Sequence, residues 1–396
     1  MRHRALRFLI ALAVLAGCTE ERANFSQHPG FAEWYAAHPP SQALPSAAER
    51  ALLQRYRPRV WLPDGHEGPI DFYRDYVAQG ELRDTDGALI SAAVTPEMLN
   101  AWKSDPAVGF THRPSGLSPR ARIYGRVDRG ELELPDCAAA LPVTFLTYNL
   151  VFRHSGLPMG LPAWQAALLA PLADLDDWHQ LDHYTALTLA LAADAAGKLT
   201  PFAATFQQHN YLRSYLLADE EGPGRLALPP DGRIALDIAL RSKELYPHRE
   251  GRVRRRAVSF MTPEAARYLV DGSDPPWLAA DDVTQPAREI EPELAVLPPA
   301  DAFYVFQGWL GERRALPGRD GPPGADYNTL PPFKSKALQL ALFYWAEDQA
   351  DYLALLGNLF ADGRPRDLAP APFTRRLARD LPAQLARAAC AAPAGA

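Results

Sequence analysis

Proline is unusually frequent in this chain, at 38 of 396 residues. A proline fixes the backbone φ angle and has no N–H to donate, so helix interiors and central strands exclude it. Many positions must therefore lie in loops, in turns or at strand edges. This pattern predicts short strands joined by long connections rather than a helical bundle.

The N-terminus combines a positive head, formed by Arg2, Arg4 and Arg7, with an unbroken apolar run over residues 8–16. The run is too short to span a bilayer, so residues 1–17 are predicted to be a secretory signal peptide. Its end, Leu15-Ala16-Gly17-Cys18, resembles the lipobox of bacterial lipoproteins, in which the cysteine is lipidated and becomes the new N-terminus. The alternative is an ordinary cleaved signal with Cys18 there by chance.

A lipidated Cys18 would make the membrane a partner of this protein, because two or more acyl chains hold a protein on a bilayer almost permanently. In such lipoproteins an aspartate after the cysteine favours inner-membrane retention, and here that position is Thr19. The resemblance therefore implies a cell-envelope protein in the periplasm or at the cell surface, anchored in the outer rather than the inner membrane. Residues 18–48 would form its tether.

Composition excludes some functions and leaves others open. An apolar fraction of 47% suffices for a real core, and the net charge of −6 argues against a general nucleic-acid binder. Cys137 and Cys390 have no Cys-x-x-Cys neighbour, so neither a redox centre nor a thiolate zinc site is favoured. A disulfide between them and two unlinked cysteines both stay open.

The order of strand-like and helix-like segments predicts a β-rich domain over residues 49–335 and a helical C-terminal extension over 336–396. Strands are expected where β-branched and aromatic residues concentrate or alternate, at residues 59–62, 143–152, 183–191, 206–209, 234–240 and 253–260. Helices are expected at residues 47–56 and 161–175, and the proline- and aspartate-rich segment 271–300 is expected to be a loop. The predicted fold class is mainly β with α decorations (α+β).

Several motifs, in this order, resemble the domain family named after vacuolar protein sorting-associated protein 62, and more distantly the necrosis- and ethylene-inducing-like proteins. They are residues 56–69, Thr147-Tyr148-Asn149, residues 179–182, residues 208–210, residues 246–251, and Gln307-Gly308-Trp309-Leu310-Gly311 with the later Gly321-Pro322-Pro323-Gly324. The resemblance implies a β-sandwich of jelly-roll type.

One departure from that pattern concerns a cation site. In the plant-toxin relatives His, Asp and Glu at positions i, i+3 and i+5 help to hold a divalent cation. His179 and Asp182 fit the first two positions, but Tyr184 stands where the Glu would be. A hard cation wants several oxygen ligands, so this loss weakens a calcium or magnesium site and argues against cytolytic activity.

The densest polar cluster, residues 176–183, precedes a predicted strand. On a loop, His179 and Asp182 could converge with His209 or His248 on a divalent metal ion, a mixed nitrogen and oxygen set suited to zinc, manganese or iron. A bound metal could activate water for hydrolysis. The alternative is that these side chains only hydrogen-bond the backbone of their own loops.

Four further residues are candidate ligand-binding groups near this proposed metal site: His66, Glu67, Asp177 and His183. The leading hypothesis is a lipid-anchored envelope protein with a binding or structural role, whose protein or glycan partner the sequence does not identify. The alternative is a metal-dependent hydrolase. Whether the protein is an enzyme, and whether it uses a cofactor, stay open at this stage.

Overall fold

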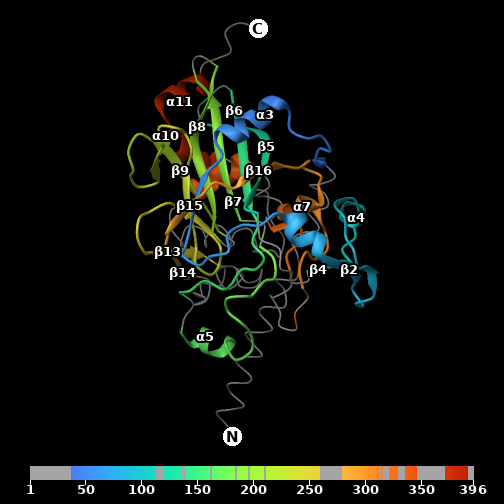
Figure 1. The fold of residues 1–396 in the computed structure, drawn as a ribbon. Coiled ribbons are helices and arrows are strands. Elements are labelled where there is room, and N and C mark those ends of the chain that lie inside the picture. Colours follow the sequence, from blue (N-terminus) through green and yellow to red (C-terminus); the bar gives the residue numbers. More distant parts are fainter. Residues whose placement is uncertain are drawn as a thin grey trace.

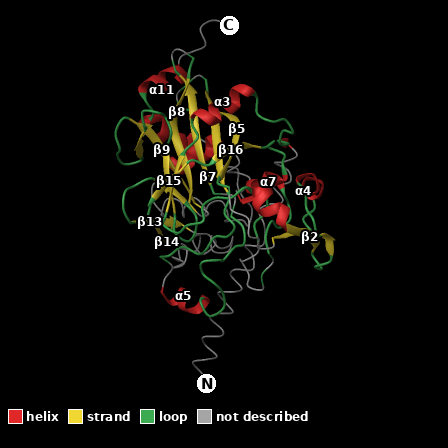
Figure 2. Cartoon of the chain, viewed as in Figure 1, coloured by secondary structure: helices red, strands yellow, loops and turns green. Residues whose placement is uncertain are grey.

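A computed structural model describes residues 37–112, 120–135, 137, 139–160, 163–182, 185–194, 197–208, 211–258, 279–312, 314, 321–328, 335–345 and 371–390. Within these ranges the chain is mainly β, with helices placed around open sheets (Figure 1, Figure 2). The predicted α+β class is confirmed at this level. Residues 1–36, including Cys18, lie outside the described part of the chain.

The largest sheet of the described residues has seven strands in the order β10-β9-β8-β7-β6-β5-β16. Its central pairs are antiparallel, and the edge strands β10 and β16 each pair in parallel with their neighbour. The strands are β5 (Arg122–Leu132), β6 (Leu141–Leu150), β7 (Ala186–Ala193), β8 (Leu199–Gln208), β9 (Tyr211–Ala218), β10 (Arg225–Ala227) and β16 (Glu293–Val296).

A four-stranded sheet in the order β12-β11-β1-β15 faces the large sheet. Its strands are β1 (Arg59–Leu62), β11 (Ala235–Ile238), β12 (Leu245–Pro247) and β15 (Arg288–Ile290). The prediction of a loop over 271–300 is wrong, because β15, β16 and β14 (Ala279–Thr284) lie in this segment. Pro286 and Pro292 fall between these short strands, where a missing N–H interrupts no pairing.

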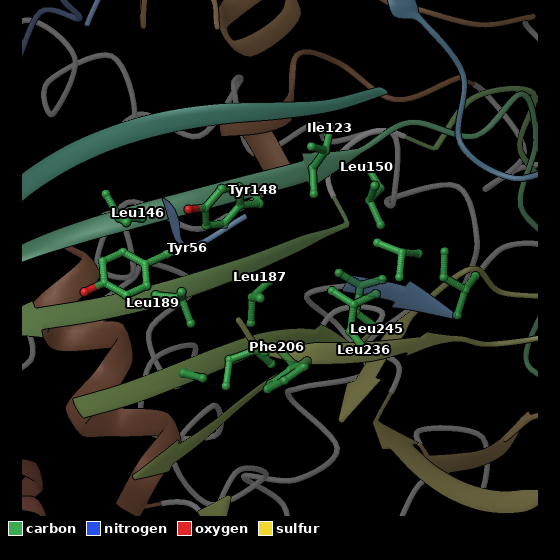
Figure 3. Packing of buried hydrophobic residues seen from close by; sticks show 14 of the residues in the cluster. Tyr56, Ile123, Leu146, Tyr148, Leu150, Leu187, Leu189, Phe206, Leu236 and Leu245 are labelled. Carbon is green, nitrogen blue, oxygen red and sulfur yellow. The ribbon is translucent and has the colours of Figure 1, made fainter. Parts of the chain in front are cut away.

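The two sheets share one hydrophobic core (Figure 3). Alternate residues of β6, among them Leu146, Tyr148 and Leu150, point toward Leu236 and Leu245 of the small sheet. Every side chain in this set is fully buried, and each such leucine contributes roughly 2 kcal/mol to the free energy of unfolding. Two facing sheets agree with the predicted sandwich, and its jelly-roll connectivity stays a prediction.

Helices cover the opposite face of the large sheet. These are α8 (Lys336–Trp345), α10 (Ala371–Asp380) and α11 (Ala383–Cys390). Leu340 and Ala341 of α8 and Leu377 of α10 are buried against sheet residues that include Phe145 and Leu216. A disulfide joins Cys137, which follows β5, to Cys390 at the end of α11. The pairing that the sequence left open is therefore present.

A smaller layer beside the large sheet contains β2 (Gly80–Asp84), β3 (Leu89–Ser91) and β4 (Val108–His112). With it lie η3, a π-helix (Phe72–Tyr76), η4 (Val77–Gln79), α4 (Pro96–Trp102), α7 (Ala302–Val305) and η5 (Ala325–Asn328). The other described elements are α3 (Ala47–Arg55), α5 (Ala163–Leu169) and the strand β13 (Val253–Val258), which pairs with β14. No helix among the described residues is long and apolar enough to cross a membrane.

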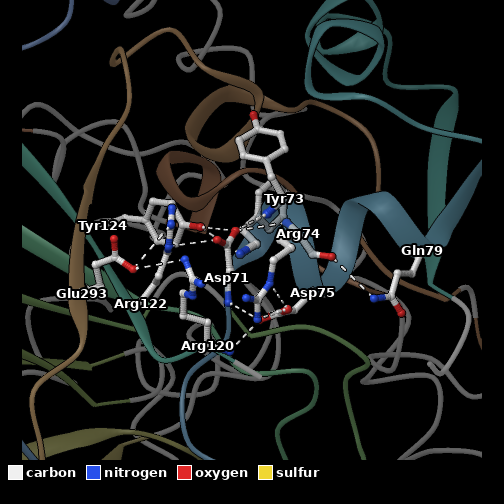
Figure 4. Close-up of polar contacts among 10 residues, drawn as sticks. Asp71, Tyr73, Arg74, Asp75, Gln79, Arg120, Arg122, Tyr124 and Glu293 are labelled. Carbon is white, nitrogen blue, oxygen red and sulfur yellow. Dashed lines mark hydrogen bonds and ion pairs between the residues drawn. The ribbon is translucent and has the colours of Figure 1, made fainter. Parts of the chain in front are cut away.

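Two buried aspartates fix the short π-helix (Figure 4). Asp71 accepts hydrogen bonds from the backbone N–H groups of Tyr73 and Arg74. It also forms an ion pair with Arg122 at 2.9 Å. Asp75 accepts from the Asp71 and Arg120 N–H groups at 2.9 and 3.0 Å. Although π-turns often mark functional sites, these carboxylates are saturated by protein donors, so this network is structural.

Candidate functional site

The proposed metal ligands that the structure describes each have a partner within the fold. Asp182, 1% exposed, accepts a hydrogen bond from the Thr185 hydroxyl at 2.6 Å. The backbone of His179 exchanges two hydrogen bonds with Ser155, at 2.9 and 3.0 Å. Such contacts fit the alternative in which this polar cluster stabilises its own loops.

His248 lies on the outer face of the small sheet. Its Nδ1 is 2.6 Å from Oδ1 of Asp237, a side chain with no exposed surface. The imidazole stacks on Trp61 with ring centroids 4.4 Å apart. Burial raises the pKa of Asp237, while the hydrogen bonds from His248 and Arg249 act to lower it. The carboxylate therefore fixes the orientation of the His248 ring.

Among the described residues, no three His, Cys, Asp or Glu side chains are arranged to hold a metal ion. His209 and His183 belong to the predicted sets but lie outside the described ranges. The metal site therefore stays a prediction.

His66 and Asp177, proposed as ligand-binding residues, are both engaged. The Nδ1 of His66 accepts a hydrogen bond from the Gly68 N–H at 2.9 Å. Burial, with the nearby charges of Lys243, His154 and Arg288, lowers the pKa of His66 to about 3. Arg314 pairs with both carboxylate oxygens of Asp177, at 3.1 and 3.0 Å.

Glu67 follows His66 in the turn and lies close enough to Lys243 and His154 to raise their pKa values through its charge. Burial nevertheless lowers both pKa values overall. These loops thus gather basic and acidic groups that offset one another in a largely buried setting.

A different set of polar residues crosses the centre of the large sheet. The strand registers place Arg126, Thr147, Thr188, Thr205 and Ser214 in one row, each directly opposite the next. Paired residues of antiparallel strands share a face, and this face is the one that α8 covers. The Thr147 and Thr188 hydroxyl oxygens are 3.1 Å apart, and those of Thr205 and Ser214 are 2.8 Å apart.

This hydroxyl row forms the floor of a cavity of about 550 Å³ between the sheet and the start of α8. Asn149 and Gln207 extend the polar floor, and Gln339 of α8 lies across from it. All of these amide and hydroxyl side chains are at most 8% exposed. The volume falls within the roughly 300–1,000 Å³ usual for small-molecule sites.

A charged cluster lines the same cavity. The Arg126 guanidinium donates through Nε to Asp128 at 3.1 Å and through an NH₂ group to Asp326 at 2.8 Å. It also lies over the Tyr304 ring, 4.8 Å from the centroid. Burial acts to lower the pKa of Arg126, but Asp128 and Asp326 outweigh it and raise that pKa. The guanidinium is therefore held rigidly in its charged form.

Lys336, the first residue of α8, lines the cavity beside this cluster. Burial and the like charge of Arg126 lower the pKa of the Lys336 ammonium, and Asp128 and Asp326 partly offset this effect. The cavity thus brings two cations and two carboxylates together.

Residues 38–41, from the end of the predicted tether, form part of the cavity wall. The carbonyl oxygen of Ser41 accepts a hydrogen bond from the Ala300 N–H at 3.0 Å, which fixes this segment against the domain. The chain that leads back toward Cys18 therefore starts at the cavity.

Sequence reasoning missed this cavity. The usable signal was polar residues at alternate positions of otherwise apolar strands: Thr147 and Asn149 in β6, Thr188 in β7, and Thr205 and Gln207 in β8. Alternation assigns such residues to one face of each strand. It does not reveal that the strands are neighbours in register.

The chain matches no protein-family model and no curated protein. Its weak structural neighbours are toxin folds of the necrosis- and ethylene-inducing-like type. A solved structure described as "Toxin fold for microbial attack and plant defense" matches with a TM-score of 0.26 and 15% identity, over 52% of this chain and 72% of that chain. One described as "Crystal structure of non-toxic HaNLP3 protein" matches with a TM-score of 0.27 and 14% identity, over 59% and 85%.

Proposed function

We propose that this protein is a lipid-anchored component of the bacterial cell envelope that binds a small polar molecule in the cavity under α8. The observation that supports this function best is the buried row of hydroxyls, Thr147, Thr188 and Thr205, on the cavity floor. Burying polar side chains costs free energy unless they find hydrogen-bonding partners. Thr147 pairs with Thr188 and Thr205 pairs with Ser214, and each hydroxyl retains hydrogen-bonding capacity that a bound polar molecule would use.

The adjacent row of the same sheet makes a useful comparison. Two residues along each strand, the next row on the same face consists of Phe145, Ala190, Ala203 and Leu216. These residues pack in an apolar core against the helices. The same layer of helices therefore covers an apolar half and a polar half of one sheet face. An entirely apolar face would stabilise the fold more, so the polar half supports a role in binding.

The location in the envelope is part of the proposal and rests on the lipobox-like Leu15-Ala16-Gly17-Cys18. Lipidation of Cys18, with Thr19 after it, supports an outer-membrane anchor. Because residues 38–41 line the cavity, the binding site would lie where the tether joins the domain, at the end of the tether away from the lipidated Cys18. The finer fold assignment, a jelly-roll sandwich related to the vacuolar protein sorting-associated protein 62 domain family, belongs to the same proposal.

A cavity-filling substitution tests the binding function. Ala186 of β7 lines the cavity, and Ala193 at the end of the same strand is exposed. We expect Ala186→Trp to abolish the thermal stabilisation that a polar small-molecule panel gives the wild-type chain, and Ala193→Trp to preserve it. Ligands that stabilise the Ala186→Trp variant as much as the wild type would place binding elsewhere.

The second candidate function is the metal-dependent hydrolase, which the Asp237–His248 pair supports. A buried carboxylate that holds one imidazole nitrogen is the arrangement that orients both metal-bound histidines and general bases. Elemental analysis of the purified chain tests this candidate. Stoichiometric zinc, manganese or iron that His248→Ala removes would support it, and a metal-free protein would reject it.

A further inference from the structure

We infer that the ligand of the α8 cavity is a neutral saccharide of one or two sugar units. This inference rests on the proposed binding function and specifies its ligand class. It uses the charge balance of the cavity, the hydrogen-bonding character of its floor and the apolar groups that adjoin that floor.

The charges of the cavity wall cancel. Arg126 and Lys336 face Asp128 and Asp326, and Arg129, the remaining cation of the wall, is paired with Glu49 at 2.9 Å. With His38 counted as neutral, the wall therefore has no net charge to offer an ion. An anionic or cationic ligand would bring an unbalanced charge against a buried floor, which is costly.

The floor offers donors and acceptors together. Each Thr hydroxyl and each Asn or Gln amide can donate and accept, which matches sugar hydroxyls, since these also do both. Asp128 and Asp326 add acceptors, and Arg126 and Lys336 add donors. A fatty acid or another apolar ligand would offer nothing to the hydrogen-bonding capacity that these groups retain.

Apolar groups adjoin the polar floor. Pro39, Pro40, Leu212 and the nearly buried Phe145 are among the apolar residues that line the cavity. A sugar ring has polar edges and C–H faces, so one ligand could meet both surfaces.

Isothermal titration calorimetry on the full-length chain tests the ligand class. The protein is purified in a polyoxyethylene detergent, because maltoside or glucoside detergents contain sugar. The titrants are neutral mono- and disaccharides, including glucose, galactose and N-acetylglucosamine, and the anionic glucuronate and glucose 6-phosphate. We expect at least one neutral sugar to bind at least tenfold more tightly than either anionic sugar.

A matched pair of substitutions on β6 localises the effect. Thr147 faces the cavity, whereas Thr144 is buried on the opposite side of the same strand. Removing one or two hydrogen bonds to the sugar should weaken binding about three- to tenfold in Thr147→Val. Thr144→Val should bind like the wild type.

The outcomes separate the inference from the proposed function. Tighter binding of the anionic sugars, or binding of other polar compounds but no sugar, would overturn the saccharide assignment and leave cavity binding intact. Equal losses in Thr147→Val and Thr144→Val would also overturn it. If no compound of either panel binds the wild-type chain, both the saccharide assignment and the binding function are wrong.

Discussion

Thr147 and Thr188 lie opposite each other on β6 and β7, with their hydroxyl oxygens 3.1 Å apart at the centre of the large sheet. Both are nearly buried, at 2% and 8% exposure, and both face the cavity. Each hydroxyl satisfies part of the other's hydrogen-bonding capacity, and each retains capacity that a ligand could use. The pair therefore links the stability of the sheet to the proposed binding.

Valine substitutions at these two positions should show how the hydroxyl pair affects the stability of the fold. Thr188→Val alone leaves the Thr147 hydroxyl without its partner and should lower the free energy of unfolding by about 1 kcal/mol. The double variant Thr147→Val with Thr188→Val removes both polar groups and should be at least as stable as the wild type. Urea unfolding measures both effects. A double variant less stable than either single variant would contradict this account.

Arg126 should be needed for folding stability. Arg126→Met leaves Asp128 and Asp326 without their shared cation, and the expected loss is about 2–3 kcal/mol, because these carboxylates are 30% and 20% exposed. Adding Asp326→Asn should recover part of the loss. The control is Arg129→Met on the same strand, whose 71% exposed side chain should contribute less than about 1 kcal/mol.

The disulfide between Cys137 and Cys390 should stabilise the helical layer. It closes a loop with a sequence separation of 253 residues and joins α11 to the chain after β5. Reduction should lower the free energy of unfolding by about 2–5 kcal/mol. Guanidinium unfolding with and without reductant measures this difference. The variant Cys137→Ser with Cys390→Ser should unfold like the reduced wild type and should not respond to reductant.

The sequence predicted strands well where the local pattern is strong. The segment 143–152 becomes β6 because alternate residues such as Leu146 and Tyr148 are buried in the shared core. The predicted loop at 271–300 was wrong because β15 and β16 are only three and four residues long. They form by pairing with β1 and β5, and no periodicity within the segment signals such pairing.

The candidate site was harder to predict, because it depends on contacts between distant segments. Asp177 pairs with Arg314, and Asp128 and Asp326 are both hydrogen-bonded to Arg126. Residues 176–183 were predicted to contribute to a site because polar residues are densest there. The cavity residues instead come mainly from five strands, from residues 38–41, from η5 and from α8. In the sequence, each polar residue of β6, β7 and β8 looks like an isolated polar substitution in an apolar strand.

The lipid anchor can be tested directly. If Cys18 is acylated, cells grown with labelled palmitate should incorporate the label into the wild-type protein and not into Cys18→Ser. The wild type should also fractionate with membranes, because its acyl chains bind the bilayer, whereas Cys18→Ser should not. Label in Cys18→Ser at the wild-type level would rule out Cys18 as the acylated residue.

Asp282 and His66 should influence stability in opposite directions as pH changes. Burial, followed by the charge of Glu244, raises the pKa of Asp282 from 3.8 to about 7. The contribution of Asp282 is therefore complete below about pH 4 and is lost as pH rises toward 7. The pKa of His66 falls from 6.5 to about 3, so its contribution is complete above pH 6.5 and is lost as pH falls.

When one of these two residues is substituted, the free energy of unfolding should follow the pH dependence that the other residue contributes. Between about pH 4 and pH 6.5 each group changes the free energy of unfolding by about 1.4 kcal/mol per pH unit, with opposite signs. Relative to the wild type, the stability of Asp282→Asn should therefore rise with pH over this range. His66→Asn, which retains an acceptor for the Gly68 N–H, should show the reverse trend. Urea unfolding at pH 4.5, 5.5 and 6.5 measures these differences, and parallel curves for all three proteins would show that neither pKa is shifted in the folded state.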